Sequence, residues 1–363
     1  MNADFILAIG ELGKEKGIDP ELLFQAVEEA LVTAYKKNFG SNQNVRVDMN
    51  KVTGELHIYA QRHIVAEVGD DPNEISLEEA RKIDPRYEVD DIVETEVTPR
   101  NFGRIAAQNA KQVVVQRIRE AERGMVFEKF SSRENDIVTG IIQRMENKNV
   151  YIDLGKAEAI LTPNEQIPGE IYQYHDRMKT YIVEVKKTSK GPQIMVSRTH
   201  PGLLKRLFEL EVPEIHDGLV EIKSVAREPG MRSKISVYTK DENIDPFGAC
   251  VGHKGMRVQT IVNELRGEKI DIVKYSSEPD QYVANALSPA KVVSTEVLEE
   301  EKICRVIVPD YQLSLAIGKE GQNARLAAKL TGWKIDIKSE SQAAEEAEQG
   351  AQEVGVAYEA DED

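Results

Sequence analysis

One short pattern near the end of the chain occurs twice, and it constrains the fold more than any other feature of the sequence. A Gly-x-x-Gly loop spans residues 252–255 and returns at residues 318–321, 66 positions later. Each copy lies between an apolar, strand-like segment and an amphipathic segment with helical spacing. After each helix the tripeptide Ile-Asp-Ile follows at a matching distance, at residues 270–272 and 335–337. The repeat therefore covers a whole folding unit rather than a single turn.

The chemistry of such a loop favours an anion. Glycine tolerates positive φ and lets backbone N–H groups approach a ligand closely. The helix that follows directs unpaired N–H groups and the positive end of its dipole at the same place. Lys254 and Lys319 add positive charge inside the two loops. An isolated Gly-x-x-Gly is more often an ordinary turn, but two copies with matching flanks indicate the KH loop that holds the backbone of single-stranded RNA.

The charge distribution modifies what the total charge implies. The 363 residues carry a formal net charge of −16, which by itself argues against nucleic-acid binding. However, residues 201–338 hold 20 basic and 21 acidic side chains, and residues 131–200 hold 10 and 9. Residues 339–363 contain nine acidic and no basic side chains, and residues 1–130 are also acidic. A near-neutral motif region still permits a basic stripe and favours moderate, selective RNA binding.

The cysteines and the N-terminus indicate a cellular compartment. Cys250 and Cys304 are the only cysteines and have apolar neighbours, so we expect core packing rather than a disulfide scaffold. The first residues lack the basic start and apolar run of a signal peptide, and no stretch of about 18 apolar residues occurs. We therefore expect a cytoplasmic protein that has no membrane segment. We also expect a monomer that needs no cofactor.

Residues 1–130 are predicted to form an α+β domain that ends in a long connector helix. Asp19 and Pro20 begin an apolar helical stripe that ends near residue 40. Alternating residues around Thr53-Gly54 predict a hairpin, and residues 76–79 have the capping-box pattern of a short helix. A long helix is expected from about residue 103 to residue 130, because this stretch contains no proline.

Residues 134–200 predict a small β-barrel. Five short apolar runs separated by turns indicate a closed barrel of the OB type. A Val-x-Gly start, an aromatic residue before Asp-Leu-Gly and a terminal Ser-Arg are typical of an S1 RNA-binding domain. Such barrels commonly bind single strands, and a purely structural barrel is the alternative. Tyr151 and Tyr181 are candidates for stacking on bases or, equally, for the barrel core.

Residues 201–276 and 277–340 are predicted to be two tandem KH units. In each, a helix precedes two strands, the loop with its helices follows, and the Ile-Asp-Ile strand comes last. This order is that of the bacterial, type II KH arrangement. Residues 341–363 are polar and acidic with little to bury, so we expect a disordered acidic tail.

In this order the modules closely resemble the bacterial NusA family of transcription termination/antitermination factors. The resemblance covers residues 1 to about 340. It is most specific at residues 244–252, 316–328 and 330–333, and residues 106–123 resemble the connector helix of the family. The fold class it implies is multidomain α+β: an α+β N-terminal domain with a connector helix, an S1 barrel and two type II KH domains.

The resemblance implies a transcription elongation factor rather than an enzyme. Members of the family bind core RNA polymerase near the RNA exit channel, on the flap of the β subunit. Their S1 and KH modules receive the emerging single-stranded RNA. By this resemblance we expect the chain to modulate pausing, termination and antitermination, and to meet other termination or antitermination factors.

The same resemblance assigns candidate site residues. Those expected to bind RNA lie in the loops and on the first helical turns after them: Gly252, His253, Lys254, Gly255, Arg257, Gln259, Gly318, Lys319, Glu320, Gly321, Gln322, Asn323 and Arg325. Those that match basic or aromatic positions near the exit channel or the RNA are Lys36, Lys37, Arg104, Lys111 and Tyr151. Isolated charges usually mean only a solvated helix face, so for the lysines and arginines this remains the alternative.

Two other classes of protein are less compatible with the sequence. The chain lacks a Gly-x-x-x-x-Gly-Lys-[Ser/Thr] loop and a His-Glu-x-x-His motif, and its six histidines form no ligand-spaced cluster. A phosphorolytic exoribonuclease also carries KH and S1 modules, but the residues ahead of the barrel are too few for its catalytic domains. A ribosomal or translational RNA-binding protein would usually be strongly basic, whereas the isoelectric point here is about 5.1.

Overall fold

The computed structural model describes residues 3–39, 42–69 and 71–346. By its internal contacts the chain divides into two compact units, Met1–Glu128 and Lys129–Asp363. Helix and strand are mixed in both units, as the predicted α+β class requires. Across the described ranges, no helix combines the length and the apolar character needed to cross a membrane.

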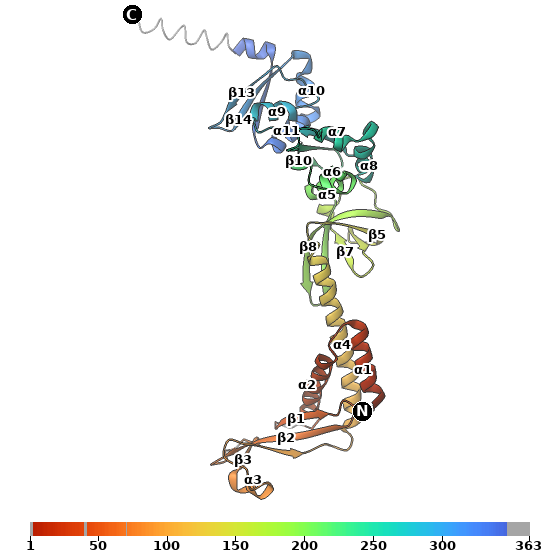
Figure 1. Cartoon of the computed structure of the whole chain (residues 1–363), viewed down its shortest axis with the longest axis vertical. Helices are drawn as coiled ribbons and strands as arrows, with labels where there is room; N and C mark the ends of the chain where they lie inside the picture. The colour runs from red at the N-terminus through yellow and green to blue at the C-terminus, as the bar shows by residue number, and fades with distance from the viewer. Residues whose placement is uncertain (1–2, 40–41, 70, 347–363) are drawn as a thin grey trace, which may run out of the picture. The chain divides into compact units, whose positions relative to one another are not determined.

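Three helices form the core of the N-terminal unit: α1 (Ala3–Lys16), α2 (Pro20–Phe39) and α4 (Phe102–Ser131). The predicted cap of α2 is present, because Asp19 Oδ1 accepts the backbone N–H of Glu21 at 2.9 Å. α4 places a buried residue at every fourth position, namely Phe102, Ala106, Ala110 and Val114. This stripe packs against the apolar face of α2 and the first sheet, so α4 completes the core that the other two helices begin (Figure 1).

The sheet of the N-terminal unit is built around one long strand. β2 (Leu56–Val65) pairs with β1 (Asn44–Met49) and β4 (Ile92–Glu96) in antiparallel fashion and with β3 (Glu74–Ser76) in parallel. The predicted hairpin around Thr53-Gly54 thus joins β1 to β2. The short helix α3 (Leu77–Ile83) begins at the predicted cap, where Ser76 Oγ accepts the N–H of Glu79 at 3.3 Å.

The predicted OB-type barrel is present in the second unit. Its five strands close in the order β5-β6-β7-β9-β8. They are β5 (Ile137–Glu146), β6 (Asn149–Asp153), β7 (Glu158–Leu161), β8 (Arg177–Thr188) and β9 (Gly191–Ser197). Gly140 lets β5 cross β6 closely, since a Cβ there would lie 2.4 Å from Ile152 Cγ2. The short helix η1 (Pro163–Glu165) follows β7.

The first KH unit has the expected type II order. Its sheet runs β10-β11-β12, with an antiparallel first pair and a parallel second pair. The strands are β10 (Glu221–Glu228), β11 (Arg232–Tyr238) and β12 (Lys269–Lys274). The helices are α5 (Pro201–Glu211), α6 (Pro213–His216), α7 (Pro246–Val251), η2 (His253–Gly255) and α8 (Met256–Glu264).

The second KH unit repeats this arrangement. Its sheet runs β13-β14-β15, again antiparallel and then parallel. The strands are β13 (Ser294–Leu298), β14 (Ile303–Val308) and β15 (Lys334–Ser339). The helices are α9 (Pro279–Ala286), η3 (Asp310–Gln312), α10 (Leu313–Ile317), η4 (Lys319–Gly321) and α11 (Gln322–Thr331). Cys250 and Cys304 are both buried in the KH cores, which confirms the prediction that they serve packing.

The two KH units share a core. Ala226 of β10 and Val273 of β12 belong to the apolar cluster of the second unit rather than to that of the first. α11 packs on β10 and β11, and α9 packs on β12. The outer face of the first sheet is therefore covered by the second unit.

The predicted acidic tail needs one correction. Residues 340–346 are helical, and Ser341 Oγ donates to Asp310 Oδ2 at 3.0 Å. Disorder is therefore the wrong expectation for residues 341–346, because this helix continues directly from β15 and is anchored to the second KH unit. The rest of the predicted tail, residues 347–363, lies outside the described residues.

Candidate nucleic-acid interface

The two glycine loops have the same backbone conformation. The first glycine has φ/ψ of 73°/178° at Gly252 and 77°/170° at Gly318. The third position is left-handed at Lys254 (50°/28°) and at Glu320 (54°/26°). The closing glycines are also left-handed. Because a non-glycine residue at positive φ is strained, the match at Lys254 and Glu320 shows that the whole loop geometry is repeated.

The first glycine of each loop is required by space as well as by φ. A Cβ on Gly252 would lie 2.7 Å from Arg257 Cγ. A Cβ on Gly318 would lie 2.8 Å from both the Cβ and the backbone nitrogen of Asn323. The loop thus folds back onto the first turn of the helix that follows it. This close approach places the loop backbone beside the start of that helix.

The helix after each loop presents an N-terminus suited to an anion. α8 begins at Met256 and α11 at Gln322, and in the described structure no side chain caps either start. The backbone N–H groups of the first turn therefore point outward with the positive end of the helix dipole. His253, Lys254 and Lys319 are exposed in the loops beside them. This arrangement can hold a phosphate of a nucleic-acid backbone.

Arg257 and Asn323 occupy equivalent positions and support the loops from behind. Arg257 Nη1 donates to the carbonyl of Ala249 at 2.6 Å and pairs with Glu214 at 2.9 Å. Asn323 is 3% exposed, and its Nδ2 donates to two carbonyl oxygens, one of them Ala316 O at 3.0 Å. Its Nδ2 is thus used in holding the loop, while its Oδ1 is buried with no hydrogen-bond partner among the described residues, and a contact of Asn323 with RNA stays a prediction.

The other candidate residues on α8 and α11 form hydrogen bonds within the protein. Gln259 is exposed and donates to Asn263 Oδ1 at 2.9 Å, along its own helix. Gln322 and Arg325 both donate to Glu228, a residue of the first KH unit, at 2.8 and 2.6 Å. Arg325 keeps a side chain that is 48% exposed, so it is accessible while it makes this contact.

Exposed apolar side chains flank both loops, and the sequence analysis did not predict them. Phe247 of α7 is 47% exposed and Met256 of α8 is 65% exposed. Beside the second loop, Leu315 and Ile317 of α10 are 47% and 37% exposed. Apolar surface next to a phosphate-holding loop is suited to nucleotide bases. The signal in the sequence was the aromatic residue at Phe247, which lies off the apolar stripe of its helix.

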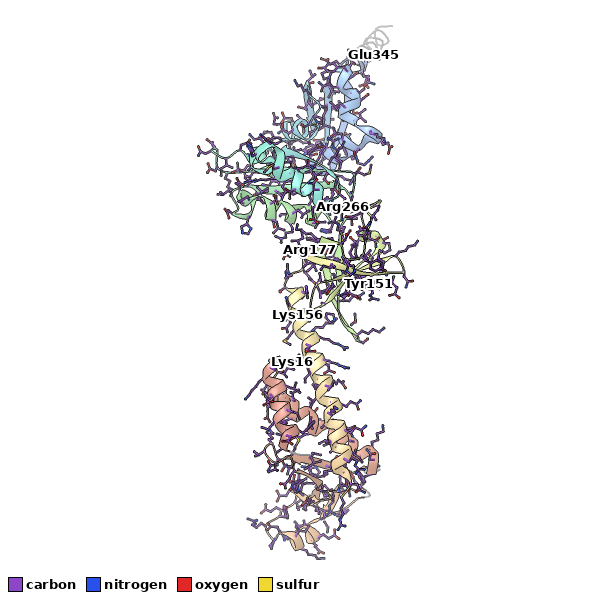
Figure 2. All side chains as sticks on the ribbon, turned by 90° about the vertical axis from the view of Figure 1, so that its right-hand side faces the viewer. Lys16, Tyr151, Lys156, Arg177, Arg266 and Glu345 are labelled. Atoms are coloured by element: carbon purple, nitrogen blue, oxygen red, sulfur yellow. The ribbon has the colours of Figure 1, made fainter. Side chains whose placement is uncertain are left out.

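The barrel holds the two candidate tyrosines differently. Tyr151 is half-buried on β6 (Figure 2), and the Arg144 guanidinium lies 3.8 Å from the centre of its ring. Arg144 also pairs with Glu158 at 2.8 Å. Tyr181 is 6% exposed and stacks on His200 at 4.5 Å, so it belongs to the core and not to a binding surface.

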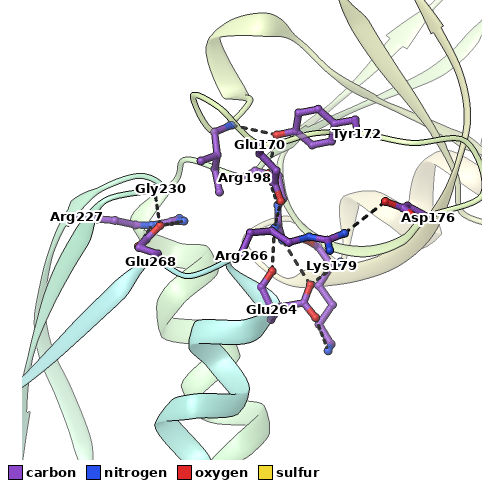
Figure 3. A network of polar contacts seen from close by, with 11 residues as sticks. Glu170, Tyr172, Asp176, Lys179, Arg198, Arg227, Gly230, Glu264, Arg266 and Glu268 are labelled. Carbon is purple, nitrogen blue, oxygen red and sulfur yellow. Dashed lines mark hydrogen bonds and ion pairs between the residues drawn. The ribbon is translucent and has the colours of Figure 1, made fainter.

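A polar network joins the barrel to the first KH unit. Arg198 is 1% exposed and lies between Glu170 and Glu264, at 2.5 and 3.4 Å (Figure 3). Tyr172 donates its hydroxyl to Glu170 at 2.8 Å, and burial raises the pKa of Tyr172. Lys179 of β8 also pairs with Glu264, at 3.1 Å. Because these charges are paired within the junction, they fix the two modules together rather than serve a ligand.

Family comparisons match each part of this architecture. A NusA N-terminal domain matches residues 4–124, and an S1 RNA binding domain matches residues 131–197. A NusA-like first KH domain matches residues 198–275, and a NusA-like second KH domain matches residues 279–345.

Curated relatives decide the family. The transcription termination/antitermination protein NusA of Halalkalibacterium halodurans is 65% identical over 345 residues, which cover 95% of this chain and 90% of the relative. This chain belongs to the NusA family. The NusA of Bacillus subtilis is 64% identical and covers 95% of this chain and 93% of its own length. The NusA of Thermus thermophilus is 42% identical, and the match covers 92% of this chain and 89% of the relative. The predicted resemblance is thereby confirmed.

In the N-terminal unit of this NusA-family chain, the four basic candidates lie on two helices that meet. Ring contacts of Phe102 with Tyr35 and Phe39 bring the end of α2 to the start of α4. Lys37 is exposed and Lys36 is half-buried in the last turn of α2. Arg104 and Lys111 are both exposed on α4, seven positions apart, and so share one helix face. The end of α2, with Lys36 and Lys37, therefore lies beside the start of α4, with Arg104, and Lys111 lies two turns farther along α4.

Histidine, cysteine and carboxylate side chains are the usual protein ligands of metal ions. Within residues 3–39, 42–69 and 71–346, no group of three or more histidine, cysteine or carboxylate side chains is arranged to hold an ion.

Proposed function

We propose that this NusA-family protein binds core RNA polymerase through its N-terminal unit and nascent single-stranded RNA through the barrel and the KH pair. By doing so it modulates pausing, termination and antitermination. Within this proposal the loops of residues 252–255 and 318–321 hold the RNA backbone. Arg325, Gln259 and Tyr151 are the accessible polar and aromatic groups beside the path.

One observation carries the RNA half of the proposal. Two loops 66 residues apart share the same unusual dihedral angles and each precedes a helix whose start has no side-chain cap in the described structure. Each KH unit accommodates about four nucleotides. Phe247, Met256, Leu315 and Ile317 supply exposed apolar surface beside the loops for the bases.

Family membership supports the polymerase half. The matched N-terminal domain holds the four basic candidates on α2 and α4. We assign Lys36, Lys37, Arg104 and Lys111 to the region that faces the exit channel and the flap of the β subunit. Other termination or antitermination factors are further partners that the family name implies.

The test uses the full chain with two matched double variants. K254E/K319E reverses the charge of one lysine in each loop, and at position 254 the left-handed backbone accepts a glutamate, since Glu320 already occupies the equivalent position. K240E/K302E makes the same charge change at exposed positions outside the loops. We expect the loop variant to bind single-stranded RNA about tenfold more weakly than the control variant. Capture of core polymerase should be equal for all three proteins.

Two results would contradict the proposal. If the loop variant and the control variant bind RNA equally, the loops are not the RNA site. If the wild-type chain captures no core polymerase, the role of the N-terminal unit is wrong, whatever the RNA result.

A further inference from the structure

Glu228 connects the first KH unit to the second RNA loop. It is the last residue of β10, and its side chain is 17% exposed. One carboxylate oxygen accepts Arg325 Nε at 2.6 Å, and the other accepts Gln322 Nε2 at 2.8 Å. Both donors lie in the first turn of α11, directly after the loop of residues 318–321. A single carboxylate thus holds the helix start on which the second loop depends.

The contact extends into the loop itself. Arg325 Nη1 donates to the backbone carbonyl of Glu320 at 3.1 Å. Glu320 is the strained, left-handed residue of the second loop. A chain of contacts therefore runs from a strand of the first unit through the Arg325 guanidinium to the loop of the second unit.

The turn that carries Glu228 is itself anchored. Arg227 forms a fully buried pair with Glu268, at 2.8 Å, and donates to the carbonyl of His200 at 3.0 Å (Figure 3 shows the Arg227 and Glu268 pair). Gly230 donates its N–H to Glu268 at 2.8 Å. Residues on both sides of Glu228 are thus fixed in the first KH unit and its link to the barrel. Because its surroundings are fixed, the Glu228 carboxylate can hold Gln322 and Arg325 in place. A mobile carboxylate would only neutralise the charge of Arg325.

We propose that Glu228 is a positioning residue that sets the second RNA loop relative to the first, so that both loops bind one strand as a pair. This inference rests on the proposed RNA binding by both loops. Apolar packing of α11 on β10 and β11 brings the units together. Apolar contacts tolerate small shifts and rotations, and the two-sided hydrogen bonding of Glu228 removes that freedom at the loop.

The proposal predicts a dependence on RNA length. An RNA of about five nucleotides engages one KH unit, and one of about 20 nucleotides reaches both. A correctly spaced second loop raises the affinity for the long RNA through its effective concentration. Loosening the spacing reduces this gain and leaves binding to one loop unchanged.

The experiment compares full-length wild type, E228Q, E228D and the control E221Q by fluorescence anisotropy with both RNAs. E228Q removes the charge, and E228D keeps the charge but is too short to reach Gln322 and Arg325 together. Glu221 lies on the same strand and pairs only with Lys223, at 2.7 Å, among the described residues. We expect E228Q and E228D to bind the long RNA about three- to tenfold more weakly, with unchanged affinity for the short RNA. E221Q should bind both the short and the long RNA with the affinity of the wild type.

Three outcomes overturn the inference. Equal losses on the short and long RNA would mean a local defect in the second loop. A gain of affinity in E228Q would mean that the carboxylate competes with phosphate for Arg325. Wild-type behaviour of both Glu228 variants on the long RNA would remove the positioning role. Failure of the proposed function is distinct from all of these, because then the wild type would bind neither RNA.

Discussion

The two KH units present the same sheet face to different surroundings. Lys234 of β11 and Arg305 of β14 are equivalent in register, opposite Asp271 and Asp336 of the neighbouring parallel strand. Lys234 is completely buried under the second unit, and its Nζ contacts Asp271 at 3.0 Å and the carbonyl of Ser288 at 2.9 Å. Arg305 has a side chain that is 53% exposed and pairs at 3.4 Å with Glu296 on the adjacent strand.

The difference shows how position in a tandem changes the role of a repeated charge. Burial lowers the pKa of Lys234, and the neighbouring Asp271 only partly opposes this effect. A charge at this depth must be paired to be tolerated, whereas an exposed pair such as Arg305 and Glu296 contributes little. The cost of removing one partner of an ion pair therefore depends on how deeply the pair is buried, and should be larger in the first unit.

The largest expected effect tests this dependence. E268Q leaves Arg227 buried without a counter-charge, so we expect the free energy of unfolding to fall by about 3–5 kcal/mol. In the second unit, E296Q breaks the exposed pair with Arg305 and should cost less than about 1 kcal/mol. Urea unfolding followed by fluorescence of Trp333, the only tryptophan of the chain, measures both. Similar costs for the two variants would mean that burial does not distinguish the units.

The next effect separates the two loops. G252A and G318A each put a side chain at a backbone conformation that only glycine adopts readily, at a cost of about 1–3 kcal/mol. The added Cβ meets a flexible arginine side chain at Gly252, but backbone nitrogen at Gly318. We therefore expect G318A to be the more destabilising variant in urea unfolding. The reverse order would show that Arg257 is less able to move than the backbone at Asn323.

A third prediction concerns pH. Burial by itself raises the pKa of Glu268, but the hydrogen bond and charge of Arg227 outweigh it and hold this pKa below the ordinary 4.5. A depressed carboxylate pKa gives stability that is present above the unfolded pKa and lost as pH falls through the folded one. The free energy of unfolding of the wild type should thus fall as the pH is lowered from about 5 to about 3. The slope should be smaller in R227M/E268Q, by up to about 1.4 kcal/mol per pH unit.

The double variant also provides a control for the first prediction. R227M/E268Q lacks the unpaired buried arginine, so it should be more stable than E268Q alone. If the wild type and the double variant have the same pH slope, the pKa of the Glu268 carboxylate does not differ between the folded and unfolded states.

The smallest expected effect concerns charge inside the loops. Glu320 places an acid in the second loop where the first has Lys254. E320Q should raise RNA affinity about threefold at low salt, with little change at high salt, because the repulsion of phosphate is screened. K254Q should lower affinity by a similar factor in the same anisotropy assay. Unchanged affinity in both variants at low salt would indicate that neither loop lies close to phosphate.

Much of the fold could be predicted because local patterns agree with it. The Asp19 and Ser76 caps, the glycine turns of the barrel and the repeated Gly-x-x-Gly each act within a few residues, so the sequence alone reveals them. Disorder is the wrong prediction for residues 341–346, because their composition is polar and the anchor of Ser341 at Asp310 lies 31 positions away. Contacts of that range leave no periodic signal.

The sequence by itself determined the modules, their order and the position of the two Gly-x-x-Gly loops, because glycine spacing and apolar periodicity are local properties. Only the tertiary structure decided which candidate side chains are available. It buried Asn323, set Arg257 behind its loop and tied Gln322 and Arg325 to Glu228. Glu228 lies more than 90 residues from both of its partners. The physical reason is that the donors left free on a side chain depend on what packs against it, and for Gln322 and Arg325 that is the other KH unit.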